Sequence, residues 1–192
     1  MFKLTKTIFT LAVALLVIGC STQTGTESYD SQISLADDGQ AMLAQSDWAG
    51  YAAMVHPQGL ERFRAQIMPG IERMIMASDG DSVNLFGKNY NSQELQSKNP
   101  EEFFNDIMNM VTEVSPDIKT TFANMTNESL GGVQDSDTMI HIVQKTHMDI
   151  GGRMVDEMNV QSVIKVDGEW KLVMSNKIDG IAMMLAQAMM PR

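Results

Sequence analysis

The chain has very little cysteine and few positive charges, and both shortages restrict what it can be. Cys20 is the only cysteine, so no disulfide can form within the chain. Acidic residues number 24 against 14 lysines and arginines, and the formal net charge is −10. The acids are scattered, which is typical of a solvated surface. A surface of this sign repels phosphates, so we expect no nucleic acid partner.

The sequence also lacks the short motifs of common catalytic sites. It has no GxSxG, HExxH, P-loop or GxGxxG pattern. His141 and His147 share one face of a predicted strand, but they lie about 20 Å apart at 3.3 Å per residue. They cannot share a metal ion through that strand alone. The sequence therefore predicts no metal site and no cofactor.

Only one long apolar run is present, from Ile8 to Ile18, after a basic start with Lys3 and Lys6. It is too short to cross a bilayer as a helix and has the length of a signal-peptide core. It ends in Val17-Ile18-Gly19-Cys20, which resembles the lipobox of bacterial lipoproteins. The resemblance implies that residues 1–19 are a cleaved export signal and that Cys20 is lipidated. It also implies a membrane-anchored protein facing the periplasm, and Ser21 favours the outer over the inner membrane.

Residues 20–33 are then expected to be the lipidated cysteine and a flexible, Ser/Thr/Gln-rich tether. Residues 34–192 suffice for one domain. Hydrophobic spacing and capping signals predict helices over about 35–43, 46–55, 58–78 and 99–115, with a kink or break at Pro69-Gly70. A short strand is expected at 83–86.

Period-two patterns predict strands over about 119–130, 138–150, 153–166 and 169–174, followed by a helix over 178–190. Gly151-Gly152 and Asp167-Gly168 supply tight hairpin turns, the second of type I′. The fold class is α+β, with N-terminal helices on one face of a curved antiparallel sheet and a C-terminal helix.

Two segments resemble the NTF2-like superfamily. Asp47-Trp48-Ala49-Gly50-Tyr51, leading to His56-Pro57, resembles its first helix. Val166-Asp167-Gly168-Glu169-Trp170-Lys171-Leu172 resembles the closing hairpin of its SnoaL-like members. The resemblance implies a cone-shaped fold with a pocket at its open end. That fold hosts enzymes, carriers and assembly modules, so it does not determine a function.

Three side chains are candidates for chemistry in such a pocket. Histidine titrates near neutral pH, so His56 suits a general base, or it ends a helix and its ring hydrogen-bonds a nearby carbonyl. Asp156 interrupts Met154, Met158 and Val160 on the expected inward face, where burial would raise its pKa. The alternative for Asp156 is a bulge that turns it to water. Tyr51 is its expected hydrogen-bonding partner.

Methionine is abundant, with 18 residues. Thioethers fill irregular cores and adaptable surfaces, and they also bind Cu(I). In the terminal helix, an apolar stripe is extended by Met183, Met189 and Met190. We therefore expect the helix to pack on the domain and to leave part of its outer face, including Met183 or Met190, accessible to a partner or a second copy. Complete burial is the alternative. The stripe consists of Ile178, Ile181, Met184, Leu185 and Ala188.

These patterns together predict a lipid-anchored, non-catalytic envelope module that binds a small apolar ligand or a protein partner. One alternative is an NTF2-like cavity enzyme of the isomerase, dehydratase or hydrolase type. The other is methionine-based copper handling.

Overall fold

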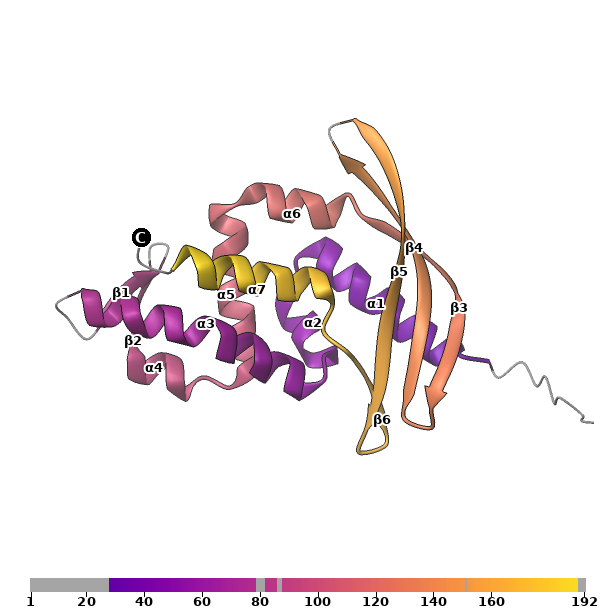
Figure 1. Cartoon of the computed structure of the whole chain (residues 1–192), viewed down its shortest axis with the longest axis horizontal. Helices are drawn as coiled ribbons and strands as arrows, with labels where there is room; N and C mark the ends of the chain where they lie inside the picture. Colours follow the sequence, from indigo (N-terminus) through magenta and orange to yellow (C-terminus); the bar gives the residue numbers. More distant parts are fainter. Residues whose placement is uncertain (1–27, 79–81, 86–87, 151, 190–192) are drawn as a thin grey trace, which may run out of the picture.

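The computed structural model describes residues 28–78, 82–85, 88–150 and 152–189. The predicted signal, Cys20 and most of the tether lie outside these residues. The fold is α+β: helices pack on one face of a four-stranded antiparallel sheet, and a further helix follows it (Figure 1). No helix among the described residues is long and apolar enough to cross a membrane.

The helical part begins at α1 (Asp30–Gln45), earlier than the expected domain start at residue 34. Residues 30–33 are therefore helix, not tether. The reason is packing: Gln32 is buried, and Ile33 and Tyr29 lie against the core. The Tyr29 ring covers Gly132, where a Cβ atom would lie 2.6 Å from the ring.

Capping side chains set most helix starts. The Asp47 carboxylate accepts from the Gly50 N–H at 2.9 Å at the start of α2, and the Asn99 amide oxygen accepts from the Glu102 N–H at 2.8 Å at the start of α5. Helix α3 runs unbroken through Pro69, so the expected break there is wrong. Its buried Ile67, Met68, Gly70 and Ile71 hold both sides of the proline against the core. The helices are α2 (Trp48–Met54), α3 (Pro57–Ala77), α4 (Ser92–Ser97), α5 (Pro100–Val114) and α6 (Pro116–Ala123).

Helix α6 corrects the strand expected over 119–130. Pro116 takes the first turn of a helix that continues to Ala123, and the strand begins only at Thr126. Phe122 is the buried residue of this short helix. One buried side chain was too little sequence signal to distinguish a short helix from the alternating pattern of a strand. The expected strand at 83–86 is present as β1 (Ser82–Leu85), paired with β2 (Lys88–Asn91), which the sequence pattern missed.

The main sheet follows the predicted meander, in the order β3-β4-β5-β6. Both residues of the last turn have positive φ, 51° at Asp167 and 90° at Gly168, as a type I′ turn requires. Gly152 also has positive φ, at 82°, while Gly151 lies outside the described residues. The strands are β3 (Thr126–Ser136), β4 (Met139–Ile150), β5 (Arg153–Val166) and β6 (Glu169–Leu172).

The two faces of the sheet differ in cover. On β4, the inward residues Ile140, Ile142, Gln144 and Thr146 are buried, and α1 crosses this inner face in contact with all four strands. The far end of the β4–β5 hairpin projects beyond the helices (Figure 1). The outer face carries no helix among the described elements, and several large apolar side chains are exposed on it.

Helix α7 (Asn176–Ala188) packs on α3 through buried Ile178, Ile181 and Ala182. Met183 is 54% exposed, which confirms the expected accessible outer side. Met184, a member of the apolar stripe, is 57% exposed and belongs to the same accessible side. Met190 lies outside the described residues, and the homodimer through this helix stays a prediction.

The core lies between the helices and is rich in aromatic rings. Phe63 of α3 contacts Phe104 of α5 edge-to-face at 4.9 Å between centroids, and Tyr51 of α2 lies 5.9 Å from Phe104. Trp48 meets Phe122 of α6 at 5.6 Å. These contacts fix α6 and, through it, one wall of the cavity described next.

Candidate functional site

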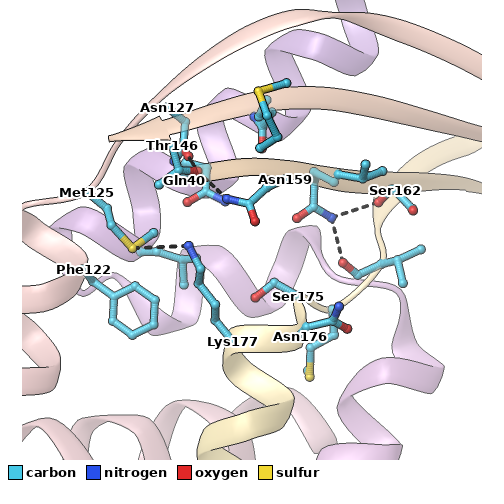
Figure 2. A pocket seen from close by; sticks show the side chains of 17 residues that line it. Gln40, Phe122, Met125, Asn127, Thr146, Asn159, Ser162, Ser175, Asn176 and Lys177 are labelled. Carbon is cyan, nitrogen blue, oxygen red and sulfur yellow. Dashed lines mark hydrogen bonds between the residues drawn. The ribbon is translucent and has the colours of Figure 1, made fainter. Parts of the chain in front are cut away.

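A cavity of about 370 Å³ lies between the inner face of the sheet and the start of α7 (Figure 2). Helix α1 contributes Gln40 and Leu43, and α6 contributes Phe122. The volume is within the range of small-molecule sites. Its polar groups come from the sheet and from the first turn of α7, because the segment after β6 leads directly into that turn.

The sheet side of the cavity is lined by neutral polar side chains that bond to one another. The Asn159 amide donates to the Thr146 hydroxyl at 2.6 Å, and that hydroxyl donates to the Asn127 side-chain oxygen. Thr146 is only 1% exposed, so this chain of bonds satisfies a buried hydroxyl. Because β3, β4 and β5 each supply one member, the bonds also tie the three strands together at the cavity wall.

Two buried glutamines complete this wall. The Gln161 amide donates to the carbonyls of Ser162 at 2.9 Å and Val173 at 2.8 Å, which holds the segment leading to α7 against β5. The Gln144 amide donates to the Ser129 hydroxyl at 3.1 Å.

Lys177 is the cation of the cavity. Its side chain rises from the first turn of α7 toward Met125 and the polar group on the sheet (Figure 2). The ammonium donates to the Met125 sulfur at 3.6 Å, a weak acceptor. No carboxylate among the described residues lies within ion-pairing distance of it. Burial lowers the pKa of Lys177, and the more distant Glu157 opposes this shift.

An apolar groove of about 430 Å³ begins where this cavity ends. It runs between α6 and α7, and Phe122, Met125, Asn176 and Lys177 line both hollows. Ile118, Ile181 and Met184 form its apolar walls. A separate hollow of about 270 Å³ between α3, α5 and α7 is lined by aliphatic and methionine side chains alone. It has no polar side chain to orient a ligand, so the cavity and its groove form the better site.

Tyr51 does not line this cavity. It is 1% exposed in the core, and its hydroxyl lies beside Ser175 without a hydrogen bond of normal geometry. Burial raises the pKa of Tyr51, and the neighbouring Ser175 opposes the shift. The phenol therefore stays neutral at physiological pH.

His56 has a structural role, but at the start of a helix and not through the carbonyl bond that the sequence analysis offered as the alternative. Its ring Nδ1 accepts from the Gln58 N–H at 3.0 Å and so caps the start of α3. Its own backbone N–H donates to the Leu172 carbonyl at 2.8 Å. His56 is thus engaged in joining the helices to β6.

Asp156 lies on the outer face of the sheet, so its expected inward position is wrong. It pairs with Lys145 and with His147, each at 2.7 Å, and these neighbours lower the pKa of Asp156. Met154, Met158 and Val160 share this face and are 66%, 59% and 62% exposed. Their apolar pattern indicated burial, but they point to the outer face of the sheet, which no described helix covers.

The predicted candidates therefore do not converge. Asp156 is on the face opposite the helices, whereas Tyr51 and His56 belong to the helical core and its junction with β6. His141 bonds to Ser162 across the strands at 2.8 Å, while His147 bonds to Asp156. Among the described residues, no group of three or more His, Cys, Asp or Glu side chains could hold a metal ion.

The sequence analysis missed Lys177 and the polar group around Thr146. The available signals were polar residues at two inward positions of a strand, Gln144 and Thr146, and a lysine in the first turn of an otherwise apolar helix. Neither signal indicates that β4 and α7 face each other across a cavity. Comparison with known proteins adds no relative: no family model matches the chain, and neither the curated proteins nor the solved structures searched contain a match.

Proposed function

We propose that the protein is a lipid-anchored cell-envelope module that binds a small, largely apolar ligand between its sheet and its helices, without catalysing a reaction on it. The continuity of the cavity, which has a polar wall, with the apolar groove between α6 and α7 carries the proposal. Amides, hydroxyls and one ammonium converge on that wall. Such groups hold and orient a ligand, and the acid–base candidates of the sequence lie elsewhere.

The anchor in this proposal is Cys20, at the end of the lipobox-like segment. The mature protein is placed at the outer membrane, facing the periplasm. Incorporation of an alkyne-tagged fatty acid into the wild-type protein, and its loss in Cys20→Ala, is the expected result. Labelling that persists in Cys20→Ala contradicts this part of the proposal.

The finer fold in this proposal is a cone of the NTF2-like kind, with the ligand at its open end. Two features support it. The sheet and α1 enclose the cavity from two sides, and the segments that resemble the superfamily form α2 and the β5–β6 hairpin. A high-resolution experimental structure, compared with NTF2-like proteins, tests this point.

The binding proposal is tested by native mass spectrometry of the full chain extracted from its envelope. We expect a co-purified small molecule that is released on unfolding. Gln40→Trp should fill the cavity and abolish the adduct. Gln45→Trp is the matched control, because Gln45 lies on the same helix, is exposed and does not line the cavity.

Equal adduct in wild type and Gln40→Trp places the ligand elsewhere and contradicts the proposal. So does a wild-type protein that carries no adduct and acquires none from envelope lipid extract.

A further inference from the structure

Lys177 occupies a position where a cation is unfavourable without a partner. It lies in the first turn of α7, at the positive end of the helix dipole. The first-turn N–H groups of a helix have no intrahelical acceptor, and they favour an anion. The ammonium is half-buried, and within the described part of the chain its one hydrogen bond is to the Met125 sulfur. Ser175 already accepts from the Ile178 and Asp179 N–H groups, so a bound anion would pair with the ammonium and accept from the N–H groups that precede them.

Among the described residues, no acid forms an ion pair with Lys177, although Asp179 lies in the same first turn. Glu157, on the inward side of β5, is the acid that acts on it across the cavity. Asp37 of α1 accepts from Ser129, and Asp179 of α7 is paired with Arg62. Helix α6 contributes no charged side chain to the cavity or the groove.

The apolar groove starts at the same lysine. Phe122 and Met125 lie beside it, and the groove continues along α6 and α7 to Met184. A further apolar hollow extends it toward Leu185 and Ala188, sharing Ile118, Ile181 and Met184 with it. The distance along α7 from Lys177 to Ala188 is about 16 Å at 1.5 Å per residue. The polar cavity, with its positive charge, thus opens directly onto a long apolar groove.

We propose that the ligand is a single-chain amphiphile with an anionic head, of the fatty-acid carboxylate class. Its head lies in the cavity against Lys177 and the first turn of α7, and its tail lies in the α6–α7 groove. This inference rests on the proposed function and specifies its ligand. Charge complementarity selects the head, and the continuity of the groove with the cavity selects an apolar chain.

Ligand binding can be followed by NMR through the methyl groups of the chain's own methionines. Full-length protein with ¹³C-methyl methionine, held in phosphatidylcholine nanodiscs, is titrated with decanoate, decanol and butyrate. Empty nanodiscs correct the free concentrations. We expect decanoate to shift the methyl signals of Met125 and Met184 together and saturably. Met76, which is 80% exposed and lines neither hollow, should not move.

Substitutions of Lys177 should show whether binding depends on the positive charge of this side chain or only on its size. Lys177→Gln should weaken decanoate binding about tenfold, as expected for loss of one charge-assisted bond, and should leave decanol unchanged. Lys177→Arg keeps the charge and should retain binding. If decanoate and decanol bind with equal affinity and Lys177→Gln changes neither, the proposal of an anionic head is wrong. The proposed function is not affected by that result.

Substitution at the tail site uses Gly180, which lines the groove and has open space where a Cβ would be. Gly180→Leu should fill the groove without a clash and weaken decanoate about tenfold, while butyrate is unaffected. Gly180→Ala is the matched control. Each methylene buried in the groove should raise the affinity about two- to fourfold. If butyrate binds as tightly as decanoate, the proposal that the groove holds the tail is therefore wrong. If no probe moves Met125, this inference fails, whereas the co-purified adduct decides the proposed function.

Discussion

Two glycines in helices provide a controlled test of how α1 is seated on the sheet. Gly39 of α1 faces Leu172 of β6, and a Cβ atom there would lie 2.4 Å from a terminal methyl carbon of Leu172. Gly180 of α7 has nothing within 4 Å of the same position. Alanine is favoured over glycine in a helix interior by about 1 kcal/mol at both sites. The difference between the two variants therefore isolates the contact with Leu172.

The expected magnitudes have opposite signs. Gly180→Ala should raise the free energy of unfolding by about 1 kcal/mol. Overpacking a core costs about 1–3 kcal/mol, and Leu172 is only 1% exposed, so its methyl has no open space to move into. After the helical gain is subtracted, Gly39→Ala should lower the free energy of unfolding by about 0–2 kcal/mol.

Urea unfolding, followed by near-UV circular dichroism, measures both values. Leu172→Ala alone should cost about 2–5 kcal/mol, but it removes the obstructing methyl groups. In the Leu172→Ala variant, Gly39→Ala should raise the free energy of unfolding. A double-mutant cycle would then give a favourable coupling energy between the two substitutions. If Gly39→Ala stabilises the wild-type protein as much as Gly180→Ala does, α1 is not held tightly against β6 and the reasoning fails.

Three further predictions concern single groups. Ser46 has a left-handed φ of 58° and a buried hydroxyl without a partner, so Ser46→Gly should stabilise the protein by about 1 kcal/mol in urea unfolding; a loss of stability would contradict this. Lys145 and His147 lower the pKa of Asp156 from its ordinary 3.8. The interactions of Asp156 with these two residues therefore stabilise the fold at pH values above 3.8, and this stabilisation is lost as pH falls through the lower pKa of the folded state. Asp156→Asn should therefore be slightly less stable than wild type at neutral pH and equal to it in strong acid, and a difference independent of pH would argue against the ion pairs. Because burial lowers the pKa of Lys177 and a bound carboxylate favours its charged form, decanoate affinity should fall as pH rises through that lowered pKa; Lys177→Arg should remove the fall, and an unchanged profile in that variant would refute the assignment.

Local signals in the sequence were enough for much of the fold. Asn99 and Pro100 predicted the start of α5, and Asp167-Gly168 predicted the turn between β5 and β6, because a cap or a type I′ turn needs only neighbouring residues. Helix α6 escaped prediction for the opposite reason, because it depends on a contact that is not local. It is short, and its place is fixed by Phe122 packing on Trp48, a contact with a residue far away in the chain.

The direction in which the sheet faces could not be read from its pattern. Met154, Met158 and Val160 alternate as buried residues do, yet they point to the uncovered outer face. A period-two pattern shows that alternate residues share a face, but not which face the helices cover. The position expected for Asp156 failed on this point.

The sequence by itself determined the longer helices, the order of the strands in the main sheet, the acidic surface and the lipobox-like segment that ends at Cys20. Each depends on composition or on residues close together in the chain. Only the tertiary structure decided the candidate site. Thr146 and Lys177 belong to different elements, and neither is unusual where it stands in the sequence. Packing of α7 against the helices, and the bonds of Gln161 to the segment before it, place the two on opposite walls of one cavity. That juxtaposition depends on long-range contacts, which a one-dimensional pattern does not specify.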